Sequence, residues 1–319
     1  MKRTIKYTIK SAKDIYKSFY PEPSFLVPGM IPLKGLTILA GPYKGCKSWF
    51  ILFLCMTLSR SGMFLGVFAL ETHKGIYLAL EDSDARLHHR MHFFEFEPGD
   101  NSLISTSFPS GIDGVNALTK LLSEDRTIEY VVIDTLGRFS SGRGKGSYQD
   151  DYDWIGLIKN IADELGVAII LVTHTRKLVD DRDEYNEITG SCGSMAVADA
   201  ILVLKKSRNS GNGTLACTGR DFEEKKYEVF FSKDSCCWTI KGECADSAST
   251  PERQSILEIL KEHGEMTPQE VSTHIERTPQ AVSNILAKLK DEGLVEKGSK
   301  YGTWVSSKHT VSTTSSISS

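Results

Sequence analysis

The chain has 319 residues, of which 25% are charged and 40% hydrophobic, and its formal net charge is −3. This length accommodates one large domain and a second small one, and this composition is that of a soluble globular protein. A net charge this close to zero excludes a global basic field for nucleic acid, so any such binding has to use local patches.

The cysteines and the apolar segments indicate the cellular environment. Seven cysteines, an odd number without a C-x-x-C pair, indicate reduced thiols and neither a disulfide framework nor a zinc site. No apolar run follows the basic residues at the N-terminus, so we expect no signal peptide. The longest apolar run, residues 49–58, is too short to span a bilayer. We therefore expect a cytoplasmic protein that does not associate with membranes.

A glycine loop between two apolar runs follows an N-terminal lead-in, residues 1–34, in which prolines break regular structure. The runs are residues 36–40 and 49–58, and the loop is Gly41-Pro42-Tyr43-Lys44-Gly45-Cys46-Lys47-Ser48. This order of strand, loop and helix nearly fits the phosphate-binding pattern G-x-x-x-x-G-K-[ST]. Backbone N–H groups and the helix N-terminus bind a phosphate in that motif. Lys47 would reach the outer phosphates and the Ser48 hydroxyl would bind Mg²⁺. We expect residues 41–48 and the adjoining Trp49 to bind a nucleotide.

Cys46 departs from the motif, which has glycine at this position because the backbone approaches the ligand closely. Cysteine is small, so the loop can survive, but the rate of hydrolysis is open. A thiol among N–H groups at a helix N-terminus is expected to be unusually acidic. The alternative for the whole stretch is a turn that binds no nucleotide.

Apolar runs alternate with helix-length segments over the next 120 residues. Strands are expected at residues 76–80, 130–134, 167–172 and 200–204, and helices at 84–97, 112–125 and 150–165. This alternation predicts an α/β fold with a mainly parallel sheet. Short alternating runs between residues 214 and 240 predict antiparallel edge strands. We expect His88, His89 and His92 to lie on an exposed polar helix face and not to form a metal site.

Polar residues follow three of these strands directly. Ligands of an open parallel sheet bind beyond the carboxyl ends of its strands, so Glu81, Asp134 and His174 should converge near the glycine loop. Asp134 suits a residue that holds hydrated Mg²⁺, and Glu81 can orient and deprotonate the attacking water. His174, or Thr173 beside it, can sense the γ-phosphate. For each residue alone, the alternative is a strand-end cap in solvent.

These motifs resemble those of the RecA-type ATPases, and within them the RepA-like and DnaB-like ring helicases of plasmids, phages and mobile elements. The segments that carry the resemblance are residues 27–29, 35–42, 77–82, 132–135, 172–174, 189–191 and 206–209. The resemblance implies a RecA-like core over residues 35–242, ATP and Mg²⁺ as ligands, DNA as a partner and assembly into a homo-oligomeric ring or filament.

The same resemblance assigns roles to individual residues. Glu81 is the catalytic carboxylate, Asp134 holds the metal and His174 is the sensor. Lys206 and Arg208 match the K-x-R finger that reaches the nucleotide of a neighbouring subunit, and Arg220 is a second candidate for such a finger.

Two loops of this family face DNA. The first, residues 137–146, would bind single-stranded DNA through Arg138, Arg143 and Lys145, and Phe139 can stack on a base. The alternative is a flexible solvated loop. The second, residues 176–188, mixes acidic and basic residues and is a weaker candidate.

The C-terminal part resembles a winged helix-turn-helix domain over residues 252–305, between a linker at 243–251 and a disordered tail at 306–319. A helix from Pro279 would be the recognition helix, and a hairpin at 297–305 would be the wing. The residues offered to duplex DNA are Gln280, Ser283, Asn284, Lys288 and Lys300. Residues 252–305 hold seven Lys/Arg and nine Asp/Glu, so 7 − 9 = −2, and protein docking is the alternative.

The sequence therefore predicts an ATP-binding and ATP-hydrolysing RecA-like protein that acts on DNA. Its expected role is that of a replicative helicase or of a replication or maintenance ATPase of a mobile element. The alternative is an ATP-dependent DNA-binding regulator with little or no helicase activity.

Overall fold

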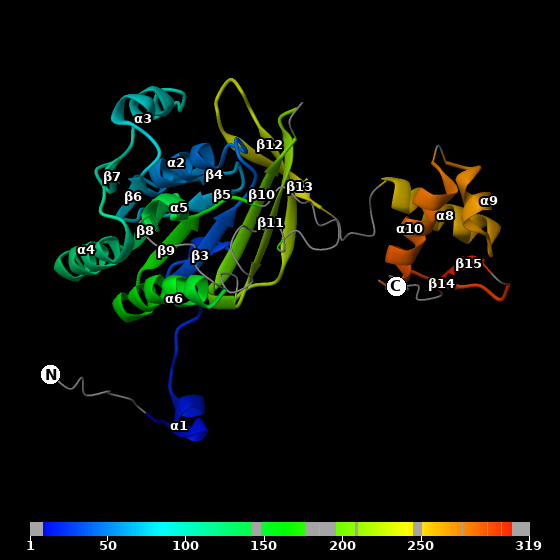
Figure 1. The fold of residues 1–319 in the computed structure, drawn as a ribbon, viewed down its shortest axis with the longest axis horizontal. Coiled ribbons are helices and arrows are strands. Elements are labelled where there is room, and N and C mark those ends of the chain that lie inside the picture. The colour runs from blue at the N-terminus through cyan, green and yellow to red at the C-terminus, as the bar shows by residue number, and fades with distance from the viewer. Residues whose placement is uncertain are drawn as a thin grey trace, which may run out of the picture. The chain divides into compact units, whose positions relative to one another are not determined.

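The chain forms two compact units, Met1–Gly242 and Glu243–Ser319 (Figure 1). The computed structural model describes residues 9–141, 148–175, 185, 196–207, 210–244, 251–275, 277–291, 293–300 and 302–307. Residues 245–250 of the expected linker and residues 308–319 of the expected tail lie outside this part of the chain. None of the described helices combines the length and the hydrophobicity that a membrane crossing requires.

A nine-stranded sheet forms the centre of the first unit as described, in the order β13-β12-β11-β10-β3-β9-β8-β6-β7. Its strands are β3 (Gly35–Ala40), β6 (Gly75–Ala79), β7 (Ser102–Ser105), β8 (Tyr130–Asp134), β9 (Ala168–Val172), β10 (Ala200–Lys206), β11 (Asn212–Gly219), β12 (Lys225–Phe231) and β13 (Trp238–Glu243). The pairs from β10 through β3, β9, β8 and β6 to β7 are parallel, whereas β11 is antiparallel to β10 and β12. The expected mainly parallel sheet with antiparallel edge strands is confirmed.

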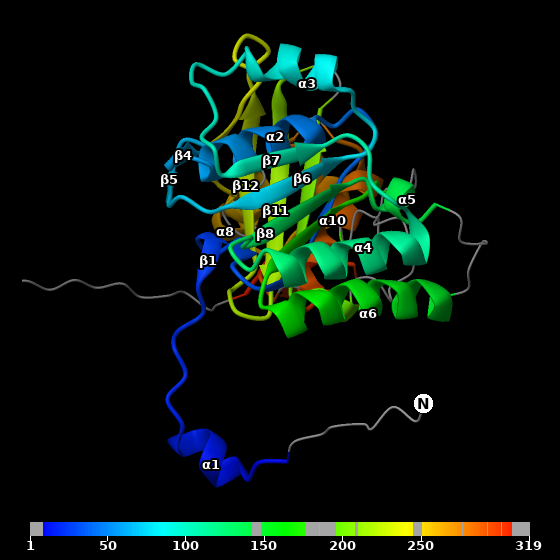
Figure 2. The ribbon, with the colours of Figure 1, turned by 90° about the vertical axis from the view of Figure 1, so that its left-hand side faces the viewer.

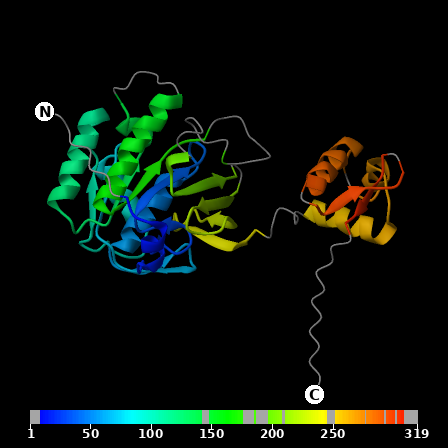
Figure 3. The same cartoon turned by 90° about the horizontal axis from the view of Figure 1, so that it is seen from below.

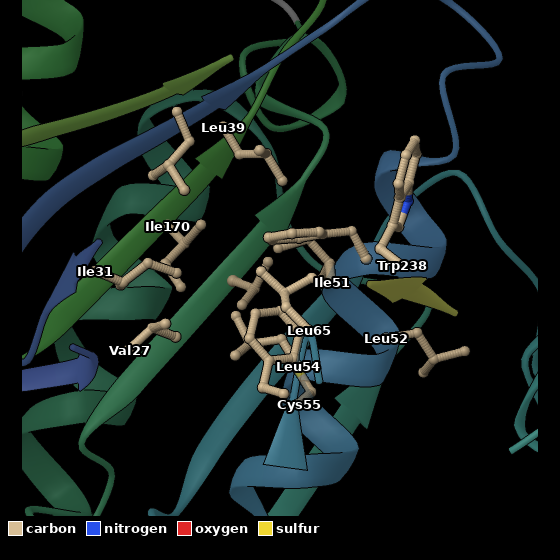
Figure 4. Close-up of a cluster of buried hydrophobic side chains, with 14 of the residues drawn as sticks. Val27, Ile31, Leu39, Ile51, Leu52, Leu54, Cys55, Leu65, Ile170 and Trp238 are labelled. Carbon is tan, nitrogen blue, oxygen red and sulfur yellow. The ribbon is translucent and has the colours of Figure 1, made fainter. Parts of the chain in front are cut away.

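Helices cover both faces of this sheet, which is why its central parallel strands are mostly apolar. On one face α2 (Lys47–Leu58) packs through Phe50, Ile51 and Leu54, together with Val132 and Ile170 of the strands. Figure 4 shows Ile51 and Leu54 in this cluster with Leu39, Ile170 and Trp238. On the other face lie α4 (Gly111–Glu124) and α6 (Tyr148–Leu165), side by side in Figure 2.

Two hairpins extend the core beside α2. One joins β1 (Phe25–Val27) to β2 (Ile31–Pro32), and the other joins β4 (Gly62–Phe64) to β5 (Phe68–Leu70). Residues 25–32 are therefore not irregular, although the prolines predicted it, because Pro28 lies in the turn and Pro32 ends the second strand. Leu26, Val27, Met30 and Ile31 are buried in the main core.

Helix α3 (Asp84–Met91) ends six residues before the expected end at residue 97. Phe94 is buried and Phe96 packs against it and against Phe53 of α2. Phe94 and Phe96 are two positions apart and both contact Phe53 of α2. Side chains two positions apart do not lie on the same face of a helix, so this packing requires the helix to end first. His88, His89 and His92 are exposed, as expected.

Asp199 fixes the start of β3. Its Oδ2 accepts a hydrogen bond from the Leu36 N–H at 2.7 Å and pairs with Lys159 Nζ of α6 at 3.0 Å. Gly35 has a φ of +95°, and a Cβ there would lie 2.3 Å from Asp199 Oδ2, so this position requires glycine. Arg220 also pairs with Asp199, at 3.7 Å, which places this finger candidate at the amino end of β10 and away from the glycine loop of its own chain.

The second unit consists of α8 (Pro251–His263), α9 (Pro268–Ser272), α10 (Pro279–Asp291) and the hairpin of β14 (Val295–Lys297) and β15 (Trp304–Ser306). Figure 3 shows the helices in orange and the hairpin in red. Thr267 and Glu270 form the capping box at the start of α9. The strand continues through Ser306, and Ser307 donates a hydrogen bond to the Leu294 carbonyl, so order extends past the expected end of this unit.

Candidate functional site

The register of the parallel strands places four strand ends at one edge of the sheet. Val172 is paired with both Leu39 and Asp134, and Asp134 is paired with Ala79. The residues that follow these ends are the glycine loop, Glu81, Thr135 and His174. The structure thus brings together the side chains that the sequence predicted to converge.

The glycine loop runs close to strand β10. A Cβ on Gly41 would lie 2.2 Å from the Leu204 carbonyl oxygen, so no other residue fits at the start of the loop. Lys44 and Cys46 both have left-handed backbones, with φ of 60° and 61°. Helix α2 then begins at Lys47, so the exposed N–H groups of its first turn follow the loop directly.

Cys46 occupies the left-handed conformation that the glycine of the motif adopts without strain. Its carbonyl accepts a hydrogen bond from Trp238 Nε1 of β13 at 3.2 Å, which ties the loop to the edge of the sheet. Burial raises the pKa of the Cys46 thiol, and the nearby cations Lys206, Arg90 and Lys47 only partly oppose this effect. The expectation of an unusually acidic thiol is therefore wrong, because desolvation outweighs the positive surroundings.

Lys47 is only 5% exposed, and its ammonium group has three partners. Nζ donates to the carbonyls of Gly41 at 2.8 Å and Pro42 at 3.0 Å, and it lies 3.1 Å from His174 Nδ1. Burial lowers the pKa of Lys47 to about 8, although the carboxylates of Asp134 and Glu81 act in the opposite direction. The side chain is thus held, still largely charged at neutral pH, at the mouth of the loop.

Asp134 is the buried carboxylate of the site, 4% exposed. Its Oδ2 accepts a hydrogen bond from the Tyr77 hydroxyl at 2.9 Å, and the Ser48 hydroxyl is also hydrogen-bonded to it. Burial raises the pKa of Asp134 despite these two bonds. A buried carboxylate beside a helix-start hydroxyl is a donor set that fits Mg²⁺, whose charge would offset the desolvation of Asp134.

Glu81 is oriented by Thr135, whose hydroxyl donates to Glu81 Oε1 at 2.8 Å. The adjacent Asp82 is held by Arg86 at 2.9 Å and Arg90 at 2.7 Å, so the chain after β6 is anchored on both sides. Sequence reasoning missed Thr135, although it directly follows Asp134, because a threonine at a strand end has no chemical signal of its own. It also missed Tyr77, whose hydroxyl function depends on the packing of β6 beside β8.

His174 stacks on Tyr43 of the glycine loop. The ring centroids are 3.8 Å apart and the planes differ by 18°. Burial lowers the pKa of His174, and the charge of Lys47 lowers it further, so the imidazole is neutral at pH 7. The His174 ring therefore lies beside the ammonium group that a bound phosphate would contact, and Tyr43 covers one face of this ring.

The expected finger residues are only partly described. Lys206 Nζ donates to the Ser207 carbonyl at 3.3 Å and lies 6.0 Å from the centroid of Phe231. Its charge acts on Cys46, so it lies on the side of the glycine loop of its own chain. Arg208 lies outside the described residues.

The first expected DNA loop begins as a short helix, α5 (Leu136–Phe139), on which Arg138 is exposed. Phe139 is fully buried, with its ring 6.2 Å from that of Trp154, so the prediction that it stacks on a base is wrong. The hydrophobic side chain belongs to the core because α5 folds back onto α6. Arg143, Lys145 and, apart from Tyr185, residues 176–195 lie outside the described part of the chain.

The expected recognition residues lie on α10 and on the hairpin of the second unit. Gln280 and Asn284 are exposed and hydrogen-bonded to each other at 3.3 Å, and Ser283 is half-buried. Lys300 is exposed at the tip of the hairpin, while the side chain of Lys288 is outside the described residues.

Two family models match this chain, one in each unit. The sequence matches the family model described as AAA domain over residues 3–180 and the model described as MarR family over residues 250–300. A search of curated proteins found no match.

Solved structures are similar to the first unit. One that is described as an ATPase domain has a TM-score of 0.52 at 15% identity, covering 65% of this chain and 84% of that chain. The structure of a DnaB-like replicative helicase has a TM-score of 0.52 at 14% identity, and the match covers 64% of this chain and 57% of that chain. The RadB recombinase has a TM-score of 0.44 at 18% identity, and the match covers 66% of this chain and 90% of that chain. The fold shared with the two structures of TM-score 0.52 and the MarR family match confirm the expected RecA-like core with a C-terminal winged-helix domain.

The left-handed backbone at position 46 predicts a stability difference between two variants. Cys46→Gly and Cys46→Ala both lose the thiol, but only glycine adopts a φ of 61° without strain. We expect Cys46→Gly to be more stable than Cys46→Ala by about 1 kcal/mol. Urea denaturation of the two variants measures this difference, and equal stability would show that the loop is not strained at this residue.

Proposed function

The chain belongs to the AAA domain family and is an ATPase, and on that premise we propose that it couples ATP hydrolysis to work on DNA. Its role would be that of a replicative helicase or of a replication or maintenance ATPase of a mobile element. The observation that carries the proposal is the convergence of Lys47, Asp134, Glu81 and His174 at the carboxyl edge of one parallel sheet.

The glycine loop would bind the phosphates of ATP. Its N–H groups, with those of the first turn of α2, offer donors to phosphate oxygens, and Lys47 supplies the charge. Ser48 and Asp134 would hold Mg²⁺, which neutralises negative charge on the phosphates when bound.

Glu81 is suited to act as the base because it is exposed and oriented, whereas Asp134 is buried. The hydrogen bond from Thr135 aims one oxygen of Glu81 and leaves the other to accept a proton from water. His174, neutral and beside Lys47, would contact the γ-phosphate.

Replacement of Glu81 by glutamine separates hydrolysis from binding. The variant keeps the shape and the bond to Thr135 but cannot take a proton, so turnover should fall about 10²-fold or more with little change in ATP affinity. Steady-state hydrolysis and calorimetric ATP binding measure the two effects. Glu71→Gln, at an exposed position away from the site, is the control, and unchanged turnover in Glu81→Gln would remove Glu81 from the mechanism.

DNA is the proposed partner of both units. Arg138 is exposed on α5, directly after the strand that ends in Asp134, so a phosphate bound there would lie next to the ATPase site. Gln280 and Asn284 on α10 offer amide groups of the kind that bind base edges. The rival function, a regulator that binds duplex DNA through this helix, would need no coupling between the two units.

The test of this function is ATP turnover with and without single-stranded DNA, together with strand displacement on a forked duplex. We expect stimulation by the single strand and displacement of the fork. In Arg138→Ala the slope of log affinity for single-stranded DNA against log salt should decrease by about 0.7, because one phosphate contact is lost. Arg126→Ala, at the opposite end of β8, is the control. Site-specific duplex binding without displacement would favour the regulator.

We further infer assembly of several copies, through the segment that precedes the core. Helix α1 (Ala12–Lys17) has no buried residue, and within the described chain Tyr16 is 91% and Phe19 90% exposed. Large apolar side chains this exposed are typical of a surface that a partner covers. A second copy of this chain is the partner that a ring or filament provides.

Removal of these rings should weaken the assembly. Burial of each aromatic side chain contributes about 1.5–3 kcal/mol, so the double variant Tyr16→Ser/Phe19→Ser should raise the dissociation constant at least about tenfold. Sedimentation velocity over a range of concentrations measures it. The double variant Met63→Ser/Val67→Ser, on the exposed β4–β5 hairpin, is the control, and equal behaviour of the two would exclude this segment from the interface.

A further inference from the structure

We propose that Tyr43 is a positioning residue that holds His174 over the mouth of the glycine loop and so links the occupancy of the loop to residues 173–175 at the end of β9. This inference rests on the proposed ATPase site and adds a residue that acts through another. Tyr43 belongs to the loop, whereas His174 belongs to the end of a separate strand, and their stacked rings connect the two elements.

The stack gives the largely exposed ring of Tyr43 an aromatic partner. Tyr43 is 67% exposed, and its contact with His174 is made face to face, with centroids 3.8 Å apart. Stacked aromatic rings attract each other when they are offset, and each ring shields one face of the other from water. Tyr43 therefore packs its ring on His174 and not on the hydrophobic core.

The hydrogen bonds of His174 determine which of its two ring nitrogens carries the proton. The charged Lys47 ammonium group is a donor only, so in its contact with His174 Nδ1, at 3.1 Å, the imidazole is the acceptor, and the ring has a further hydrogen bond with the Gly41 backbone. A neutral imidazole that accepts at Nδ1 carries its proton on Nε2, which is then a donor for a phosphate oxygen. The stack restricts rotation of the ring and thereby fixes the direction of this Nε2–H group.

The backbone on both sides of His174 is bonded to the loop and its strand. The Thr173 N–H donates to the Leu39 carbonyl at 2.9 Å, and the Thr175 N–H donates to the Gly41 carbonyl at 3.1 Å. The Gly41 carbonyl also accepts from Lys47. Phosphate oxygens that reach Lys47 compete with both Gly41 and His174, so a change at the ammonium group is passed to residues 173–175.

The first experiment compares Tyr43→Phe, Tyr43→Leu and Tyr43→Ala in the full chain. Phenylalanine keeps the aromatic face, so we expect it to lose the least kcat of the three variants. Leucine and alanine lose that face, so kcat should decrease about 2- to 10-fold while KM for ATP changes less. Tyr152→Ala, a half-exposed tyrosine on α6, is the control, and thermal unfolding verifies that each variant is folded.

Nuclear magnetic resonance of histidine labelled with ¹⁵N reports on the stack directly. The His174 signals are assigned by their loss in His174→Gln. In the parent and in Tyr43→Phe we expect the Nε2–H tautomer and ring protons shifted upfield by the stacked ring. In Tyr43→Leu and Tyr43→Ala the upfield shift should disappear. Loss of the upfield shift follows from removal of the ring itself, so the tautomer is the deciding signal: a parental Nε2–H tautomer in Tyr43→Ala would overturn the positioning role.

The outcomes separate this inference from the proposed function. If Lys47→Ala no longer binds ATP in calorimetry but Tyr43→Ala keeps the parental kcat, the ATPase site stands and the role of Tyr43 is overturned. A rise in KM with unchanged kcat also overturns it, because Tyr43 would then bind nucleotide itself. If Lys47→Ala binds ATP as the parent does, the proposed site fails. Loss of DNA affinity without loss of basal kcat in Tyr43→Ala would make Tyr43 a base-stacking residue and overturn the inference.

Discussion

The buried ammonium group of Lys47 is the constraint on which the site depends. A lysine that is 5% exposed has to have each of its donors paired, and two loop carbonyls and one imidazole do so here. The carbonyls are available because the loop turns sharply between Gly41 and Cys46. The imidazole is available because β9 lies next to β3 and ends at the same level. The parallel register of the sheet is therefore what allows a charged side chain to be held at this depth.

Asp134 is a buried charged group as well, but its charge is negative. Its carboxylate lies next to hydroxyl groups from two elements, Tyr77 in β6 and Ser48 at the start of α2. Hydroxyls stabilise the charge less than a cation would, and the pKa of Asp134 stays raised. Lys47 and Asp134 are thus both held in environments that penalise their charge. Binding of oppositely charged groups, phosphate at one and Mg²⁺ at the other, would remove both penalties at once.

Much of the fold could be predicted because strands buried on both faces are almost continuously apolar, as residues 130–133 are ahead of Asp134. Strand β7 could not be predicted, because its sequence has only two apolar residues, Leu103 and Ile104, between two serines. These two residues are partly exposed at the edge of the sheet, where a strand does not need a longer apolar run. Of the candidate site, the residues at strand ends were predictable from the topology of parallel sheets. The partners that orient them were not, because the bonds of Thr135 and Tyr77 depend on which strands are neighbours. The acidity expected of Cys46 failed for a related reason, since burial depends on the packing of the whole loop.

The second unit shows why net charge alone says little about its partner. Glu265 accepts hydrogen bonds from Ser299 Oγ at 2.9 Å and the Lys300 N–H at 2.8 Å, and Thr303 also donates to it. These bonds lower the pKa of Glu265, so the carboxylate remains charged at the tip of the hairpin beside Lys300. A fixed negative charge there opposes contact between the hairpin and DNA phosphates. Gln280 and Asn284 on α10 are exposed and joined to each other through neutral amides. Under the proposed function, contacts of this helix with base edges would therefore cost less electrostatic free energy than contacts of the hairpin with phosphates.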